Sequence, residues 1–283
     1  MAKTAVFSVI FPANLEFFNQ FLSSLEVQTM KDFDLLLLID SIEDIDEHIA
    51  RYKRKLNIVT HKASGTIAEV RDIGFKWICD CDYKNIVFSD SDDLMAKDRL
   101  AVCVDGLSSY QLIVNDVVPF CNKVAGTKGY WRSRMHNGHE FGPDELQNYN
   151  FVGLGNSAIR SEIISQCEIP PDLSVVDWFV FFHWMQGKRG VFSHEGSVFY
   201  RQTSDNIAGV DNITDKRLLD ILQVKLRHYQ ALLNGFPEFR TQLERHRELY
   251  EKLRTNNLLP EAVHSLRSKG INYFWWEEPI HLL

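Results

Sequence analysis

The chain has 283 residues, 45% of them hydrophobic and 24% charged, which suits one large folded domain or one domain with an appendage. A net charge of −7 argues against nucleic acid as the main partner, because phosphate backbones are bound chiefly by clustered Lys and Arg. The five cysteines form no CxxC pair, which disfavours zinc and favours reduced thiols. The sequence shows no leader-like segment and no apolar run of about 18 residues, so we expect a cytoplasmic protein.

The first hundred residues alternate short apolar runs with segments of helical periodicity. The apolar runs predict strands, and the segments between them predict helices, the second of which has a polar face. The predicted strands are residues 5–11, 33–39, 56–60 and 85–88, and the predicted helices are residues 15–27, 43–55 and 66–79. Continuous apolar strands that alternate with helices predict an α/β fold with a mostly parallel central sheet and helices on both faces.

The rest of the chain has a different character. Residues 122–150 are rich in Gly, Asn, His and charge, and such a long loop is typical of a lid or a binding loop. Residues 218–233 and 239–253 have the apolar spacing of two amphipathic helices. We therefore predict one domain over residues 1–211, followed by a C-terminal helical region over residues 212–283.

Polar residues follow three of the predicted strands, where a sheet of this kind binds its ligands. They are the turn at residues 12–14, Asp40, and an acidic cluster that contains Asp90, Asp92 and Asp93. Crowded carboxylates repel one another unless a cation lies among them, and Mg²⁺ and Mn²⁺ prefer oxygen ligands while keeping positions open for phosphates. The cluster therefore predicts a metal site at Asp90 and Asp92, and a solvated turn is the alternative.

Several segments, in order, resemble the motifs of family 2 glycosyltransferases, which have the GT-A fold. The resemblance covers roughly residues 5–210. The matching segments are residues 7–14 (family pattern SVIIPTYN), 23–29, 33–40, 65–74, 86–93, 175–178 and 200–209. Each match is loose, but their order and spacing together are specific.

This resemblance implies an inverting, metal-dependent transfer of a sugar from a UDP-, GDP- or dTDP-linked donor to a hydroxyl acceptor. Residues 1–100 would form the nucleotide-sugar-binding half, and residues 101–211 the acceptor-side half. The implied general base is Asp177, and the implied acceptor-side residues are Asn156 and Trp178. The implied nucleotide-sugar-binding residues are Pro12, Ala13, Asn14, Asp40, Gly65, Arg71, Asp90, Ser91, Asp92 and Arg201, with Asp90 and Asp92 also holding Mn²⁺ or Mg²⁺.

The chemistry fits these positions, although two residues depart from the family pattern. An inverting transfer needs a carboxylate to take the proton of the acceptor hydroxyl and a metal to neutralise the departing diphosphate. Taken alone, Asp177 would equally suit a helix N-cap. Val176 replaces the usual Glu, and Thr203 replaces a His that helps hold the metal or the diphosphate, which leaves the third metal ligand open. His194 is a candidate replacement.

The acceptor and the partners are inferred from what is usual in this family. They imply a glycan or lipid-linked acceptor in bacterial surface polysaccharide biosynthesis. The basic C-terminal helices suggest contact with the inner face of the membrane, or else a solvated hairpin that packs on the domain. The aromatic tail at residues 271–283 suggests core or a contact in a homo-oligomer. A non-catalytic nucleotide-sugar-binding module and a sugar nucleotidyltransferase are the other function classes, and the turn at residues 12–16 lacks the Gly-rich basic signature of the latter.

Overall fold

The computed structural model describes residues 3–120, 129–202, 214–255 and 258–268. The strands are β1 Thr4–Ile10, β2 Asp34–Asp40, β3 Asn57–Ala63, β4 Asn85–Phe88, β5 Leu94–Met95, β6 Leu112–Phe120, β7 Glu140–Phe141, β8 Ser157–Arg160 and β9 Gly190–Arg201. The α-helices are α1 Leu15–Glu26, α2 Asp46–Ile49, α3 Ile67–Cys79, α4 Arg99–Gly106, α5 Val176–Trp184, α6 Asp215–Leu233, α7 Arg240–Thr255 and α8 Leu259–Ser268. Short 3-10 helices are Pro12–Asn14, Trp131–Ser133, Pro143–Gln147, Ser161–Ile163 and Pro237–Phe239.

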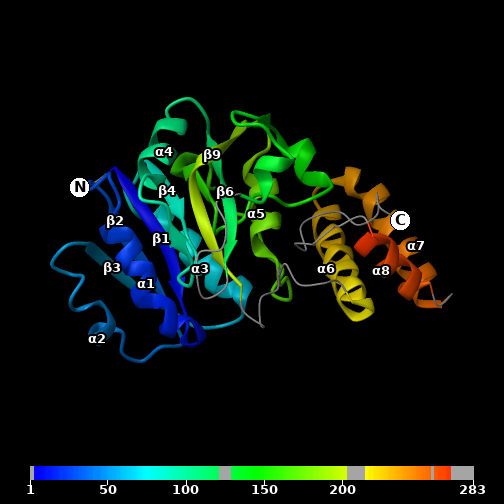
Figure 1. Ribbon diagram of the computed structural model, residues 1–283, viewed down its shortest axis with the longest axis horizontal. Helices are drawn as coiled ribbons and strands as arrows, with labels where there is room; N and C mark the ends of the chain where they lie inside the picture. Colours follow the sequence, from blue (N-terminus) through cyan, green and yellow to red (C-terminus); the bar gives the residue numbers. More distant parts are fainter. Residues whose placement is uncertain (1–2, 121–128, 203–213, 256–257, 269–283) are drawn as a thin grey trace.

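The strands form one sheet in the order β3-β2-β1-β4-β8-β6-β9-β5, and β7 pairs with β9 (Figure 1). The first four strands are parallel, as the sequence predicts. β8 then runs antiparallel to both β4 and β6, whereas β6 and β9 are parallel. The prediction of an α/β fold with a mostly parallel sheet is confirmed.

The sheet buries both faces because its inner strands are mostly apolar, and every residue of β1 and β4 is buried. In β1, Phe7 and Val9 lie in the hydrophobic cluster that contains the buried face of α3. Val6 and Ile10 lie in the cluster on the opposite face, with α1 and α4. This double burial removes the apolar area of these side chains from water and fixes the strand order around the polar strand ends.

The predicted helix at residues 43–55 is mostly wrong, because only Asp46–Ile49 is regular helix. The buried residues there do have helical spacing, but the backbone hydrogen bonds of residues 52–56 mix three- and four-residue steps. Tyr52 is fixed to α1, since its hydroxyl donates to the Asn19 carbonyl at 2.8 Å. This side-chain anchor holds the segment as irregular turns.

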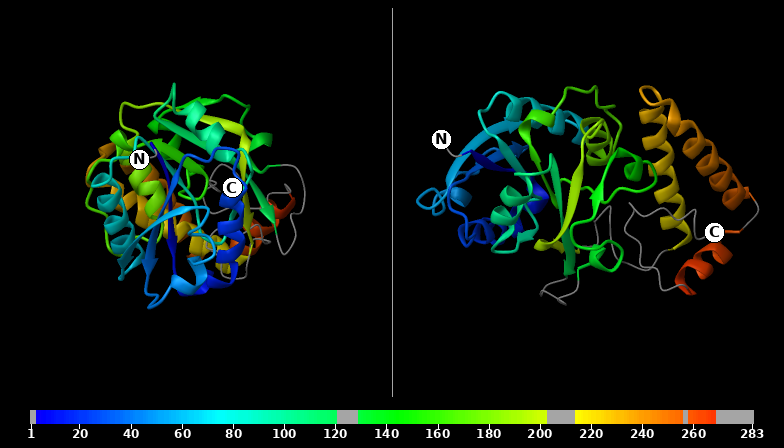
Figure 2. Two further views of the ribbon diagram at one scale, coloured as in Figure 1. Left: turned by 90° about the vertical axis from the view of Figure 1, so that its left-hand side faces the viewer. Right: turned by 90° about the horizontal axis from the view of Figure 1, so that it is seen from above.

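The C-terminal helices lie at the end of the molecule opposite β3 and α2 (Figures 1 and 2). The two predicted helices are confirmed as α6 and α7. Their buried residues, such as Leu222 and Leu253, belong to the same hydrophobic cluster as α5, so the hairpin packs on the sheet domain. Within the described residues, no helix is long and apolar enough to cross a membrane. The predicted boundary at residue 211 and the tail at 271–283 lie outside the described residues.

Candidate active site

The acidic cluster forms a tight loop directly after β4. The Asp93 N–H donates to the Asp90 carbonyl at 3.3 Å, which closes the turn. Ser91 is completely buried, and its Oγ accepts a hydrogen bond of 3.0 Å from Asn14 Nδ2. The turn after β1 and the loop after β4 are therefore tied together, as expected for residues at the carboxyl ends of neighbouring parallel strands.

Two carboxyl groups of this loop have raised pKa values. Burial, followed by the charge of Asp90, raises the pKa of Asp92 to about 6. Burial and the charges of Asp92 and Asp90 raise the pKa of Asp93 well above its ordinary value. Asp93 Oδ1 accepts the Arg201 N–H at 2.8 Å, but Oδ2 has no hydrogen-bond partner in the described part of the chain. A divalent cation would lower the repulsion among these oxygens, so the residues present fit a metal.

Three arginines surround the acidic loop. Arg71 Nη2 lies 3.7 Å from Asp90 Oδ1, and Arg201 Nε donates to the Asp92 carbonyl at 2.7 Å. Arg99 is completely buried, and its Nη2 donates to the Phe88 carbonyl at 2.8 Å, at the last residue of β4. Sequence reasoning missed Arg99, because an arginine that precedes a short apolar stretch looks like an ordinary surface residue.

Asp177 lies on the first turn of α5 and faces this loop. Burial is the main cause that raises its pKa to about 6, Asp90 raises it further, and Arg71 lowers it. Asp177 is therefore close enough to Asp90 and Arg71 to be affected by both charges, and a small part of its surface stays open to solvent. The helix N-cap is Val175, and Asp177 lies inside the helix, where its Oδ1 accepts the N–H of the adjacent Trp178 at 2.7 Å. The alternative that Asp177 is an N-cap is therefore wrong.

A glycine loop joins the two acidic positions. A Cβ on Gly155 would lie 2.6 Å from Asp90 Oδ2, and a Cβ on Gly153 would lie 3.5 Å from Asp177 Oδ2. The backbone of residues 153–155 thus lies directly against both carboxylates. Side chains here would fill the space that separates the carboxylates from this loop.

Asn156, predicted on the acceptor side, builds this glycine loop. Its Nδ2 donates to the Asn115 and Phe151 carbonyls at 3.1 and 3.2 Å, and its Oδ1 accepts the Gly153 N–H at 2.8 Å. The side chain is buried and its amide is engaged on both sides. Its observed role is to fix the loop between the two carboxylates.

The other predicted donor-side residues follow β1, β2 and β3. Pro12 and Ala13 are exposed in the turn after β1, and Asp40 is half-buried at the end of β2. Asp40 Oδ1 accepts a 2.8 Å hydrogen bond from Ser41 Oγ, and Ser41 has a φ of 56°. The parallel register brings these strand ends to one edge of the sheet.

Gly65 precedes Thr66, the N-cap of the helix α3 that carries Arg71. It has a φ of 143°, and a Cβ there would lie 2.7 Å from Glu69 Oε2. Glu69 needs that space because it forms a capping box with Thr66, which fixes the first turn of α3. Gly65 therefore leaves room for this cap, and its own contact with a nucleotide sugar stays a prediction.

Trp178 does not agree with its predicted acceptor contact. The indole is completely buried, and its Nε1–H donates to the Leu146 carbonyl at 2.6 Å. It therefore has no surface to offer an acceptor. The sequence could not show this burial, since the residues that cover the ring come from α6, about fifty positions later.

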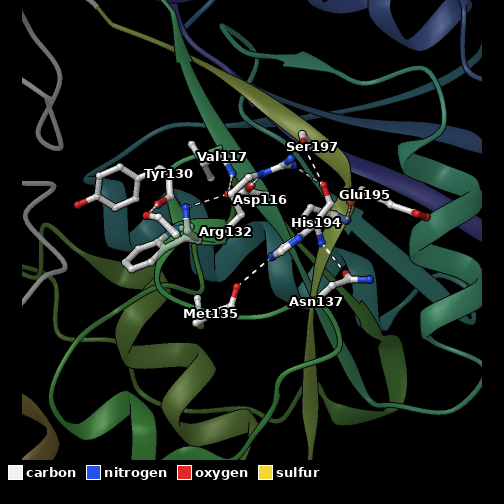
Figure 3. A network of polar contacts seen from close by, with 12 residues as sticks. Asp116, Val117, Tyr130, Arg132, Met135, Asn137, His194, Glu195 and Ser197 are labelled. Carbon is white, nitrogen blue, oxygen red and sulfur yellow. Dashed lines mark hydrogen bonds and ion pairs between the residues drawn. The ribbon is translucent and has the colours of Figure 1, made fainter. Parts of the chain in front are cut away.

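His194, the candidate replacement metal ligand, is engaged elsewhere. Figure 3 shows its ring directed at Met135, whose carbonyl lies 2.9 Å from Nε2. In the same network, Arg132 joins the buried carboxylate of Asp116 to the His194 carbonyl and so holds the residues around 130–135 on β6 (Figure 3). No group of three His, Cys, Asp or Glu side chains placed to hold a metal occurs in the described residues. Thr203 lies outside them.

Comparisons with known proteins agree with this geometry at the level of the fold. No protein-family model matches the sequence, and no curated protein matches it. S. aureus TarS 1–349 in complex with UDP-GlcNAc is similar with a TM-score of 0.63 and 14% identity, over 92% of this chain and 78% of that chain.

Two further structures are similar. The mannosyltransferase PcManGT from Pyrobaculum calidifontis, in complex with GDP-Man and Mn²⁺, has a TM-score of 0.59 and 15% identity, over 95% of this chain and 75% of that chain. GalNAc-T7 with UDP, GalNAc and Mn²⁺ has a TM-score of 0.52 and 13% identity, over 90% of this chain and 58% of that chain. The chain therefore has the GT-A fold of these glycosyltransferases.

Proposed function

We propose that this protein is an inverting glycosyltransferase of the family 2 type, which transfers a sugar from a nucleotide-diphosphate donor to a hydroxyl acceptor. The observation that carries the proposal is that one short glycine loop lies against Asp90 at Gly155 and against Asp177 at Gly153, and that the charge of Asp90 raises the pKa of Asp177. A carboxylate of the loop after β4 and a carboxylate of α5 thus belong to one site. A single displacement needs this arrangement, with a proton acceptor on one side and a stabilised leaving group on the other.

The donor side is formed by the acidic loop and the strand ends beside it. Asp40 and the turn that holds Asn14 would bind the nucleoside, and Arg71 would contact the diphosphate. Arg201 orders the acidic loop through its bond to the Asp92 carbonyl. The proposed donor is a UDP-, GDP- or dTDP-linked sugar. Two of the similar structures contain UDP-GlcNAc and GDP-Man.

Asp90 and Asp92 would hold Mn²⁺ or Mg²⁺, which neutralises the charge that develops on the departing diphosphate. The cation would also favour the ionised form of Asp92, whose pKa is raised to about 6 without it. Phosphate oxygens and water can complete the coordination of such an ion, so a third protein ligand is not required.

Asp177 acts as the general base. Its pKa of about 6 leaves the carboxylate ionised at neutral pH and close to the value that favours proton transfer. As the acceptor oxygen bonds to the anomeric carbon, its proton passes to Asp177, and the bond from that carbon to the diphosphate oxygen breaks. The configuration at the anomeric carbon inverts as a result.

The acceptor is proposed as a glycan or a lipid-linked sugar of a bacterial surface polysaccharide. The same proposal includes a cytoplasmic location and a homo-oligomer. It also includes peripheral contact of the basic C-terminal helices with the inner face of the membrane. Salt-sensitive binding to anionic vesicles would support the membrane contact.

A panel of nucleotide sugars tests the function. Donors are screened for thermal stabilisation with and without Mn²⁺, because only donors that bind the folded state raise the melting temperature. The stabilising donor is then assayed for release of its nucleoside diphosphate with and without a hydroxyl acceptor. Binding without turnover would favour the non-catalytic module, and release of pyrophosphate from a nucleoside triphosphate and a sugar phosphate would favour the nucleotidyltransferase.

A further inference from the structure

The C-terminal helix α6 touches the residue next to the proposed base. Trp178 follows Asp177 on the first turn of α5, and its indole is completely buried. His228 of α6 lies flat on this indole, with the ring centroids 3.9 Å apart and an interplanar angle of 16°. The hydrogen bond from Nε1 to the Leu146 carbonyl fixes another edge of the indole.

Three residues on one face of α6 hold the indole. Tyr229 meets it edge-on, with centroids 5.5 Å apart at 72°, and Lys225 Nζ lies 5.4 Å from the ring centroid. Positions 225, 228 and 229 are neighbours on a helix surface, so α6 presents them together. All three side chains are buried, which makes this contact part of the core between α5 and α6.

His228 contributes its flat face and not its hydrogen-bonding atoms. Neither of its ring nitrogens has a hydrogen-bond partner among the residues that the structure describes. Burial and the charges of Lys225 and His183 lower its pKa well below the ordinary value, so the imidazole is neutral. A phenyl ring of similar shape should therefore replace it.

The position of Trp178 in turn helps to direct the Asp177 carboxylate, which also has a side-chain hydrogen bond with Asn150. The Trp178 backbone N–H donates to Asp177 Oδ1 at 2.7 Å. Because the indole is held on its face and at its nitrogen, the peptide unit that carries this N–H has little freedom to move. A general base must be aligned with the proton that it accepts, so loss of this alignment should slow the chemical step.

We infer that His228 is a positioning residue for Asp177, which acts through the stacked Trp178, and that α6 thereby completes the active site. This inference rests on the proposed role of Asp177 as the base. It assigns the C-terminal helical region a part in the reaction that the GT-A domain alone does not explain.

His228→Ala and His228→Phe are compared with wild type and with Leu243→Ala, which removes a buried side chain from α7. We expect His228→Ala to lower kcat about tenfold with KM for the donor within about twofold, since the defect lies in alignment. Its acidic limb in the pH profile of kcat/KM should move to higher pH, because the N–H bond that lowers the pKa of Asp177 is weakened. His228→Phe should restore both, and Leu243→Ala should lower Tm without changing kcat.

A second readout does not depend on activity. The Trp178 indole N–H resonance, assigned by its loss in Trp178→Phe, should exchange with solvent at least about tenfold faster in His228→Ala and at the wild-type rate in His228→Phe. Unchanged exchange and kcat in His228→Ala, or equal kcat losses in His228→Ala and Leu243→Ala, would overturn the positioning role. Wild-type turnover in Asp177→Asn would instead overturn the proposed base, whatever the exchange rates show.

Discussion

The acidic loop after β4 and the start of α5 both hold a carboxylate whose pKa is raised to about 6, but the surroundings differ. In the loop, burial and the charge of Asp90 raise the pKa of Asp92, while Arg201 and Arg71 lower it. At α5, burial and the charge of Asp90 raise the pKa of Asp177, while hydrogen bonds from the Trp178 N–H and the Asn150 side chain lower it. Asp92 thus belongs to a cluster of neighbouring carboxylates, whose repulsion a cation relieves, whereas Asp177 is the one carboxylate at its helix start and can be relieved by a proton. On the proposed function, the first region holds the metal and the second accepts the proton.

Among the substitutions that test this comparison, Asp177→Asn should have the largest effect on activity. The amide keeps the shape of the side chain but cannot accept the proton, so we expect kcat to fall about 10³-fold. Stabilisation by the donor with Mn²⁺, measured as the shift in Tm, should stay within experimental scatter of wild type. Turnover within tenfold of wild type would show that another group takes the proton.

Asp92→Asn should impair the acidic loop after β4. Loss of a metal ligand should lower kcat/KM about 10²-fold and abolish the part of the donor-induced Tm shift that depends on Mn²⁺. Asp46→Asn is a matched control, since it removes an exposed carboxylate that forms an ion pair with Lys53 far from the acidic loop in sequence. A normal Mn²⁺-dependent shift in Asp92→Asn would place the metal elsewhere.

The two glycines of the 153–155 loop allow a direct comparison of both regions. Gly155→Ala places a methyl group 2.6 Å from Asp90 Oδ2 and must displace that carboxylate, so donor KM should rise about tenfold. Gly153→Ala places its methyl 3.1 Å from Asn156 Oδ1 and 3.5 Å from Asp177 Oδ2, so the Asn156 amide must shift by a few tenths of an ångström while Asp177 need not move, and kcat should change less than about threefold. Steady-state kinetics of the two variants checks this order, which the reverse result would contradict.

The pH dependence of kcat/KM should show a smaller effect than the Asp177→Asn, Asp92→Asn and Gly155→Ala substitutions. With Mn²⁺ at saturation, Asp92 is held ionised, and the remaining limb belongs to Asp177, which works as the deprotonated form. Activity should therefore rise with pH through about 6, so kcat/KM falls about fourfold between pH 8 and 5.5. A limb centred near pH 4 would mean that burial of Asp177 has little effect on its protonation.

The sequence predicted the features that depend on short stretches of the chain. The strands through β4 and the acidic loop follow from apolar runs and the residues that end them, and the fold class is confirmed. Burial of Arg99 and Trp178 depends on segments far away along the chain, β6 and α6, which local patterns do not indicate. Asn156 lay in a stretch that the sequence indicated, but its two carbonyl acceptors are visible only once β6 and β8 are paired.

The antiparallel pairing of β8 with β4 also has a consequence for the order of folding. β1, β2 and β3 pair with one another in chain order, whereas Asn85 of β4 must find Thr4 of β1, and Ile86 of β4 must find Ile159 of β8. Long-range closures are slow because the chain loses entropy before it gains contacts. We expect β1, β2 and β3 to become protected from hydrogen exchange before β4 and β8. Asp90, which follows β4, and the glycine loop, which directly precedes β8, would then meet late, so that the active site is assembled only after the first three strands have paired.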